Sequence, residues 1–294
     1  MTGHVEIFEV GPRDGLQNET RAIATEDKVA LVDLLSQAGF RRIECASFVS
    51  PKWVPQMADS AEVLAGIRRA PGVSYAALTP NMKGLERAIE ARADEVSVFG
   101  SASEGFSCAN INATIAESLE RFAPVVAAAR EAGLPVRGYV SCVCDCPFDG
   151  PVPPEAVARV AAALRAMGCY EISLGDTIGR ATPEAVDAML AAVLDEVPAN
   201  ELAGHFHDTA GRALSNVEAA LARGLRVFDA AVGGLGGCPY APGAAGNVAT
   251  EAVHDRLTAL GYDTGLDPAV LASAATMARA MRPPRETIQQ EAGR

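Results

Sequence analysis

Residues 202–208, Leu202-Ala203-Gly204-His205-Phe206-His207-Asp208, place two histidines two positions apart at the end of a short apolar run. Side chains two apart in a strand point to the same face, so His205 and His207 can reach one metal ion together. Further candidate ligands lie far away in the sequence: Asp14, within Gly11-Pro12-Arg13-Asp14-Gly15, and Asn247, at the end of a glycine-rich run. Ligands this distant meet where the strand ends of a closed architecture converge, so the pattern predicts a metal-dependent barrel enzyme.

Short apolar runs alternate with amphipathic helical patterns along the whole chain. The runs predict eight strands, at 5–10, 42–47, 73–78, 95–99, 136–141, 170–174, 202–206 and 227–232. Helix ends are marked as well: Thr25 is a candidate N-cap, Thr182-Pro183 opens a helix, and Gly39, Gly133 and Gly224 are expected to end helices. Eight strand–helix alternations in a chain of this length favour a (β/α)₈ TIM barrel over an open sheet.

We predict a single catalytic domain over residues 1–294. The barrel should span about residues 4–265, followed by extra C-terminal helices and a polar tail within 266–294. Active sites of this fold lie at the carboxyl ends of the strands. The polar residues expected at that end are Arg13, Asp14, Glu44, Ser101 to Glu104, Asp176, His205, His207 and the loop 233–247.

Composition limits the classes of partner. The formal net charge of -12 and the pI near 4.9 argue against binding nucleic acid or an anionic membrane, so an anionic substrate needs a local cluster of Arg or Lys. No run reaches the ~18 apolar residues of a membrane helix, and the N-terminus lacks the form of a signal peptide. Seven cysteines are too sparse for a disulfide scaffold, which favours a reduced cytoplasm.

The candidate ligands form a mixed nitrogen and oxygen set. A lone histidine would more often be a satisfied structural residue, but a pair at strand spacing followed by Asp208 favours a metal site. A set without thiolate suits Mg²⁺ or Mn²⁺, although zinc accepts similar ligands. Cys142-x-Cys144-x-Cys146 lacks the C-x₂-C spacing of structural zinc and is not expected to bind metal.

Two charged residues and one cysteine are candidates for the chemistry. Arg13 could form a structural ion pair with Asp14 or stabilise an oxyanion, and Glu44, expected to point into the barrel, needs Arg13 as its partner. Glycines at 233, 234, 236 and 237 suggest a mobile lid that carries Cys238. On such a lid Cys238 could act as a general acid or base.

Longer motifs carry a family resemblance. They are Val10-Gly11-Pro12-Arg13-Asp14-Gly15-Leu16-Gln17-Asn18-Glu19, Ser47 to Met57, Val136 to Cys142, Gly168 to Thr177, and Gly234-Leu235-Gly236-Gly237-Cys238-Pro239-Tyr240-Ala241 leading to Gly246-Asn247. Through them the chain resembles the 3-hydroxy-3-methylglutaryl-CoA lyases, metal-dependent TIM-barrel lyases related to isopropylmalate and homocitrate synthases. The likeness runs from about residue 5 to residue 264.

The resemblance implies a set of roles. Asp14, His205, His207 and Asn247 would bind a divalent cation, Arg13, Glu44, Asp176 and Cys238 would be catalytic, and Glu251 would support the metal side. It implies metal-dependent cleavage of 3-hydroxy-3-methylglutaryl-CoA to acetyl-CoA and acetoacetate, as in leucine degradation, with His205 or Asp176 as the base. The expected partner is an acyl-CoA substrate, and a homodimer or higher homo-oligomer is expected.

Two alternatives remain at this point. The same chemistry could act on a different branched 3-hydroxyacyl-CoA, or run in reverse as a condensation, although the synthases carry an extra C-terminal region. A metal-dependent barrel hydrolase would place its His-x-His pair after the first strand and would need further histidines, and the remaining two, His4 and His254, lie elsewhere.

Overall fold

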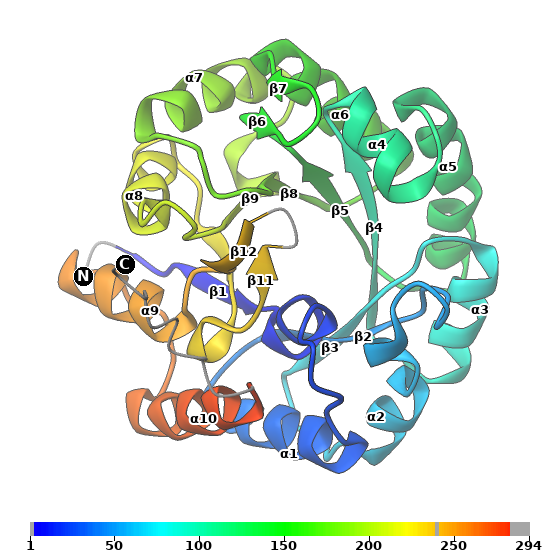
Figure 1. Cartoon of the computed structure of the whole chain (residues 1–294), viewed down its shortest axis with the longest axis vertical. Coiled ribbons are helices and arrows are strands. Elements are labelled where there is room, and N and C mark those ends of the chain that lie inside the picture. Colours follow the sequence, from blue (N-terminus) through cyan, green and yellow to red (C-terminus); the bar gives the residue numbers. More distant parts are fainter. Residues whose placement is uncertain (1–2, 239–240, 283–294) are drawn as a thin grey trace, which may run out of the picture.

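Eight parallel strands close into a barrel with the hydrogen-bonded order β1-β10-β9-β8-β5-β4-β3-β2, with helices around it (Figure 1). The computed structural model describes residues 3–238 and 241–282, and of residues 237–238 and 241–245 the backbone only. The (β/α)₈ prediction is confirmed. The barrel strands are β1 (Glu6–Glu9), β2 (Arg42–Ser47), β3 (Ser74–Leu78), β4 (Glu95–Ser101), β5 (Val136–Ser141), β8 (Glu171–Asp176), β9 (Leu202–Phe206) and β10 (Val227–Ala230).

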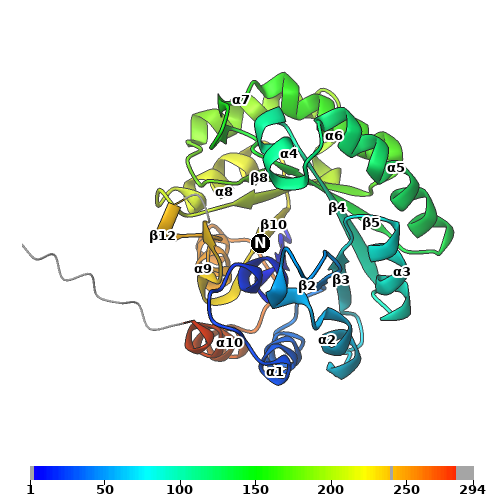
Figure 2. The same ribbon diagram turned by 45° about the vertical axis from the view of Figure 1, so that its right-hand side comes forward.

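Helices follow each strand and pack on the outside of the barrel (Figure 2). They are α1 (Thr25–Leu35), α2 (Ser60–Gly66), α3 (Met82–Glu90), α4 (Glu104–Ile111), α5 (Ile115–Glu131), α6 (Pro154–Met167), α7 (Pro183–Leu194), α8 (Ala213–Ala222), α9 (Thr250–Ala259) and α10 (Pro268–Met281). Short helical turns are η1 (Gly11–Gly15), η2 (Pro55–Met57), η3 (Ala199–Glu201) and η4 (Val232–Gly234). Among the described residues, no helix is long and apolar enough to cross a membrane.

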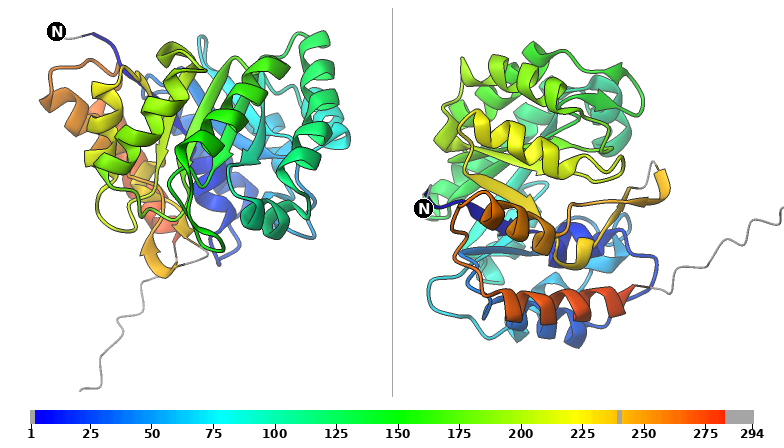
Figure 3. Two further views of the ribbon diagram at one scale, coloured as in Figure 1. Left: turned by 90° about the horizontal axis from the view of Figure 1, so that it is seen from above. Right: turned by 90° about the vertical axis from the view of Figure 1, so that its left-hand side faces the viewer.

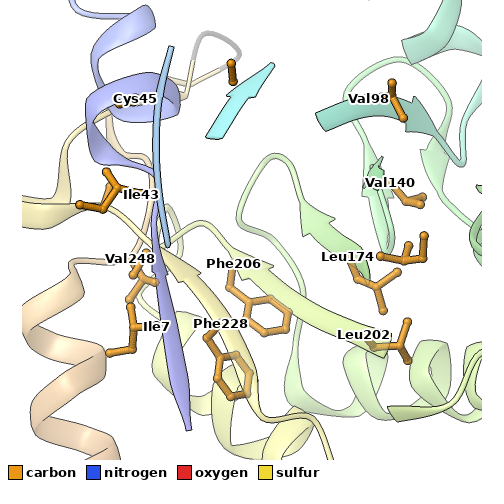
Figure 4. Close-up of a cluster of buried hydrophobic side chains, with 14 of the residues drawn as sticks. Ile7, Ile43, Cys45, Val98, Val140, Leu174, Leu202, Phe206, Phe228 and Val248 are labelled. Atoms are coloured by element: carbon orange, nitrogen blue, oxygen red, sulfur yellow. The ribbon is translucent and has the colours of Figure 1, made fainter. Parts of the chain in front are cut away.

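Strand alternation divides the barrel into a helix-facing layer and an interior. Apolar side chains such as Ile7, Val140, Leu174 and Phe206 form part of one buried hydrophobic cluster (Figure 4). The residues between them point into the barrel interior, and several of them are charged. Arg137 is fully buried there, and Asp229 is 2% exposed. An unpaired buried charge is very unfavourable, so each charged side chain in the interior needs a partner of opposite charge there.

Two short hairpins extend the loops at the carboxyl ends of the strands. One is β6 (Asp145–Cys146) with β7 (Gly150–Pro151), and the other is β11 (Gly237–Cys238) with β12 (Ala241–Ala245). The second hairpin lies at the end of the barrel opposite the N-terminus (Figure 3). Neither hairpin has an alternating pattern long enough to be recognised in the sequence, and neither was predicted.

Some predicted helix boundaries need correction. Thr25 is the first residue of α1 rather than its N-cap, because its hydroxyl donates to Asp59 (2.8 Å) and Ala24 holds the cap position. Thr182 does cap α7, accepting the Ala185 N–H at 3.2 Å. After Leu266 the described part of the chain has one helix, α10, where more than one was expected. The predicted polar tail from residue 284 lies outside the described residues.

Candidate active site

Arg13 and Asp14 lie on η1, a π-helical turn directly after β1. The carbonyl oxygen of Val10 accepts the N–H groups of Arg13 (3.2 Å), Asp14 (2.8 Å) and Gly15 (3.2 Å). Such turns are rare and frequently lie at functional sites. This wide turn places the two neighbouring charged residues at the mouth of the barrel, where the sequence predicted them to lie.

The predicted ligands at the carboxyl ends of β1 and β9 come together in space. Ligand atoms of Asp14, His205 and His207 all lie within 4.8 Å of one another. Nε2 of His205 is 3.3 Å from Nε2 of His207 and 4.0 Å from Oδ2 of Asp14. Atoms that bind one cation at ~2.0–2.2 Å are separated by ~3–4 Å, so these spacings fit a shared divalent ion.

Asn247 is the fourth predicted ligand and it adjoins this group. It forms an isolated β-bridge with His207, and its Nδ2 donates to Oδ2 of Asp14 at 2.7 Å. The carboxamide oxygen is then the atom that could bind a cation. The structure therefore brings together all four residues that were predicted from three separate parts of the sequence.

Asp229 of β10 determines how His205 is oriented. Its Oδ2 lies 3.1 Å from Nδ1 of His205, which leaves Nε2 directed at the cluster. The same carboxylate accepts two hydrogen bonds from Arg137 (2.7 and 3.0 Å) and one from Ser173 (2.8 Å). A carboxylate that binds the far nitrogen of a histidine is the usual support of a metal-ligating imidazole.

The charge states of the cluster suit cation binding. Burial lowers the pKa of His207 to about 4, with a contribution from the nearby charge of His205, so this ring is neutral near pH 7. Burial opposes ionisation of Asp14, but the charges of Arg13 and His205 outweigh it and lower the pKa to about 2. A neutral imidazole and an ionised carboxylate are the forms that bind metal.

Arg13 pairs with Glu44 inside the barrel, as predicted from the alternation of strand β2. Its Nε donates to Oε2 of Glu44 at 2.5 Å, and its Nη1 to Oδ1 of Asp14 at 2.7 Å. Glu44 also accepts hydrogen bonds from Ser97 (2.6 Å) and Tyr139 (3.1 Å). Three hydrogen-bond donors hold this carboxylate, so the guanidinium of Arg13 that binds it has a fixed position.

Asp176 ends β8 outside this group of ligands. Its two carboxylate oxygens accept the backbone N–H groups of Arg180 (3.2 Å) and Ala181 (3.0 Å), so the side chain also shapes the turn into α7. Burial raises its pKa. In the barrel Asp176 pairs in register with Phe206 of β9, the residue between His205 and His207, so it lies on the strand next to the two histidines.

The glycine-rich segment, predicted to form a mobile lid, begins in the short helical turn η4. Gly233, Gly234 and Gly236 have positive φ (66°, 63° and 106°), a backbone conformation that glycine adopts without strain. Glu251, predicted to support the metal side, accepts the N–H of Gly233 (3.0 Å) and pairs with Arg279. Cys238 has its backbone in β11, and its side chain lies outside the described residues.

Of the three closely spaced cysteines, Cys146 is held by hydrogen bonds within the protein. Sγ of Cys146 accepts hydrogen bonds from the Ser103 hydroxyl (2.8 Å) and from the N–H groups of Phe148 and Asp149 (3.4 Å each). Among the residues that the structure describes, Asp14, His205 and His207 are the group of His, Cys, Asp and Glu side chains that could hold a metal ion.

Sequence reasoning missed the interior residues that support the site. Asp229 and Arg137 each interrupt a strongly apolar strand with a charge, which is a signal that a partner must be present. That signal does not say which partner, because β5 and β10 are not neighbours in the barrel and their side chains meet across its interior.

A parallel eight-stranded barrel with a carboxylate–imidazole cluster at the carboxyl ends of its strands defines the class of TIM-barrel enzymes with a candidate divalent-metal centre. Within that class, the family description HMGL-like matches residues 4–278, and the chain belongs to this family of carbon–carbon lyases.

Individual relatives agree with the family. The chain is 59% identical to the 3-hydroxy-3-isohexenylglutaryl-CoA/hydroxymethylglutaryl-CoA lyase of Pseudomonas aeruginosa, over 92% of this chain and 90% of that protein. It is similar to the crystal structure of the HMG-CoA lyase from Brucella melitensis (TM-score 0.95, 63% identity, 96% of this chain and 99% of that one). An HMG-CoA lyase from Acinetobacter baumannii, in complex with coenzyme A and 3-methylmalate, has a TM-score of 0.89 at 39% identity, with 95% and 91% covered.

Proposed function

We propose that this protein cleaves 3-hydroxy-3-methylglutaryl-CoA to acetyl-CoA and acetoacetate. Relatives at 58–59% identity over about nine-tenths of the chain are lyases for this thioester. The observation that carries the proposal is that the Asp14–His205–His207 group lies directly beside the Arg13–Glu44 pair, since Arg13 binds Asp14. The reaction needs both: ligands for a divalent ion that would bind the hydroxyl and the free carboxylate, and a guanidinium that would stabilise the thioester enolate.

The residues that would hold the divalent cation are Asp14, His205, His207 and Asn247. When bound, the cation would acidify the tertiary hydroxyl and orient the free carboxylate. Two imidazoles with carboxylate and amide oxygens suit Mg²⁺ or Mn²⁺, and we propose one of these as the physiological ion.

Arg13 is proposed to stabilise the charge that develops on the thioester oxygen. As the bond between C2 and C3 breaks, its electron pair moves into the acetyl-CoA enolate, and a guanidinium held in advance at the oxygen lowers that barrier. Glu44, with its hydrogen bonds from Ser97 and Tyr139, keeps Arg13 in place. Burial opposes the charge on Arg13, but Glu44 and Asp14 outweigh it and raise its pKa, so the guanidinium stays protonated.

The hydroxyl proton must pass to a base, for which the sequence offered His205 and Asp176. His205 directs one nitrogen, Nε2, at the cluster, because Nδ1 is bound to Asp229. A nitrogen that binds a cation accepts no proton at the same time, so we assign His205 as a ligand. Asp176 then remains the proposed acceptor: burial raises its pKa, which makes it the stronger base, and each oxygen keeps a second lone pair.

Cys238 is proposed to protonate the acetyl enolate, which completes acetyl-CoA. The strand β11 that carries it belongs to the hairpin at the carboxyl end of the barrel (Figure 1). A covalent role for this thiol would need an adjacent activating base, and the neighbours Gly237 and Pro239 offer none.

One assay tests the proposal: release of acetyl-CoA by the purified protein after exhaustive chelation, and again after adding Mg²⁺ or Mn²⁺. We expect no turnover in the chelated protein and recovery with either ion. Full turnover after chelation would refute the role of the cation. In the same assay Asp176→Asn should lose ~10²-fold or more in kcat if Asp176 accepts the proton. Near-normal turnover would show that Asp176 only stabilises the turn into α7 and does not accept the proton.

A second substrate deserves the same assay. The Pseudomonas aeruginosa relative is named for both the 3-isohexenyl and the 3-methyl thioester. The same assay should therefore compare kcat/KM for 3-hydroxy-3-methylglutaryl-CoA with kcat/KM for thioesters that bear longer branches at C3. A higher value for a longer branch would make that thioester the preferred substrate without changing the chemistry.

Three further expectations stay proposals. We propose that residues 1–294 form one catalytic domain, that the protein acts in the cytoplasm, and that it assembles as a homodimer or a larger homo-oligomer. Light scattering of the purified protein tests the last of these.

A further inference from the structure

Helix α10 ends beside the start of the glycine-rich segment, and two of its arginines contact that segment. Arg279 and Arg282 are three residues apart, so they lie on one side of the helix end. Each binds a glutamate, and each glutamate also accepts a backbone N–H of a glycine. We name this set of four side chains, Arg279, Arg282, Glu19 and Glu251, the α10 latch.

The first half of the latch holds Gly233. Arg279 forms an ion pair with Oε1 of Glu251, and Oε2 of Glu251 accepts the N–H of Gly233 at 3.0 Å. Glu251 is in the first turn of α9, so this contact joins α9 and α10 to η4, the turn that follows the barrel strand β10.

The second half of the latch holds Gly236. Nε of Arg282 donates to Oε1 of Glu19 at 3.2 Å, and the same oxygen accepts the N–H of Gly236 at 3.4 Å. The two Nη atoms of Arg282 donate to the carbonyl oxygens of Gly233 and Gly236, at 3.4 Å each. One guanidinium therefore spans both ends of the segment 233–236.

Close packing leaves this segment little room to move. A Cβ on Gly233 would lie 3.1 Å from the carbonyl oxygen of Ala275 and from Cβ of Ala278, both in α10. A Cβ on Gly236 would lie 3.1 Å from Nδ2 of Asn247 and 3.4 Å from Cα of Gly15. The segment is therefore packed between α10 on one side and Gly15 and Asn247 on the other, and Cys238 follows two residues later.

We propose that Arg279 and Arg282 are positioning residues for the reaction: they fix the segment 233–236 and thereby the point from which β11, with Cys238, leaves the barrel. In this proposal the segment 233–236 is the fixed base of the hairpin. This inference rests on the proposed function for the role of Cys238 as proton donor, but the placement of β11 can be tested separately.

The test compares Arg279→Gln, Arg282→Gln and the double variant with Arg256→Gln. Arg256 is a matched control because it forms an exposed ion pair with Glu218 at 2.6 Å, away from the glycine-rich segment. For each protein, kcat, KM and the affinity of the apo-protein for Mn²⁺ are measured. The rate at which iodoacetamide alkylates Cys238 is followed by peptide mass mapping.

We expect the Arg282 and double variants to lose ~10-fold or more in kcat, because each hydrogen bond to a charged group can account for about a factor of ten. The alkylation rate of Cys238 should change by a similar factor. KM and Mn²⁺ affinity should stay within ~2–3-fold, as should every value for Arg256→Gln.

Unchanged alkylation in the double variant would overturn the inference, and so would a parallel loss of Mn²⁺ affinity, which would indicate general disruption of the site. Cys238→Ala separates this inference from the proposed function. If that variant keeps full kcat, Cys238 is not the proton donor, yet the alkylation rates still decide whether the two arginines place β11.

Discussion

Replacing Asp229 by Asn removes one negative charge from the barrel interior and leaves its shape almost unchanged. In the protein this carboxylate receives two hydrogen bonds from Arg137, one from Ser173 and the contact with Nδ1 of His205. An asparagine retains one acceptor oxygen, and its amide group turns a donor toward Arg137 or toward His205. At least one buried donor then faces another donor.

The size of the effect follows from these contacts. Breaking a buried ion pair on one side destabilises a protein by ~3–5 kcal/mol. Arg137 keeps its hydrogen bond to Glu171 (2.6 Å), so we expect the lower end, about 3 kcal/mol in the free energy of unfolding. Because His205 loses the partner that orients its ring, cation affinity should fall by ~10–100-fold.

The assay is a Mn²⁺ titration of the apo-protein, followed by electron paramagnetic resonance, beside urea unfolding without metal. Leu190→Ala is the matched control: Leu190 is a fully buried residue of α7, and truncating it should destabilise by ~2–5 kcal/mol without touching the site. If Asp229→Asn bound Mn²⁺ as tightly as the unaltered protein, or if Leu190→Ala lost affinity equally, our view of Asp229 as the support of His205 would be wrong.

Four further outcomes are expected. Burial raises the pKa of Glu9 from 4.5 to about 7, so between these pH values the carboxyl is protonated more in the folded than in the unfolded chain. The free energy of unfolding should therefore fall by roughly 3 kcal/mol as the pH rises from 4.5 to 7. Urea unfolding at pH 5 and pH 8 should show that Glu9→Gln abolishes this fall. His207→Ala should weaken Mn²⁺ binding by ~10-fold or more in the same titration, and unaltered affinity would remove it from the ligand set. Arg13→Met should fold normally and lose ~10²-fold in kcat; a loss of metal affinity at constant turnover per bound ion would make Arg13 structural. Cys238→Ser should bind substrate but lose ~10²–10⁴-fold in kcat with no acyl-enzyme by mass spectrometry, and a trapped thioester on Cys238 would contradict this.

The barrel could be predicted from the sequence because its signals are local. Each strand is a short apolar run bounded by turn residues, and strands such as β2, β5 and β9 begin and end where the periodicity places them. Local competition explains the error at Thr25: its hydroxyl could have capped α1, but Asp59, 34 residues later, takes that hydrogen bond.

The positions of the candidate ligands could be predicted for a different reason. Two histidines at strand spacing are a recognisable signal, and in this fold the carboxyl ends of all the strands meet at one mouth. The support of those ligands was not predictable, because Asp229 and Arg137 meet across the barrel and only the three-dimensional register pairs them. The α10 latch was missed for the same reason: Glu19 and Arg282 are 263 residues apart.

The seam of the barrel, where β1 pairs with β10, has a consequence for how the protein is made. Asp14 follows β1 and Asn247 follows β10, and the two residues, in hydrogen-bond contact, are 233 positions apart. A growing chain on the ribosome exposes Asp14 first and completes the ligand set only when almost the whole barrel has emerged. A cation bound there at 100 times its Kd would add about 2.7 kcal/mol to the folded state, and that stabilisation acts on the joint that closes last in synthesis. The ion would therefore stabilise the closed barrel of the newly made protein before it takes part in any reaction.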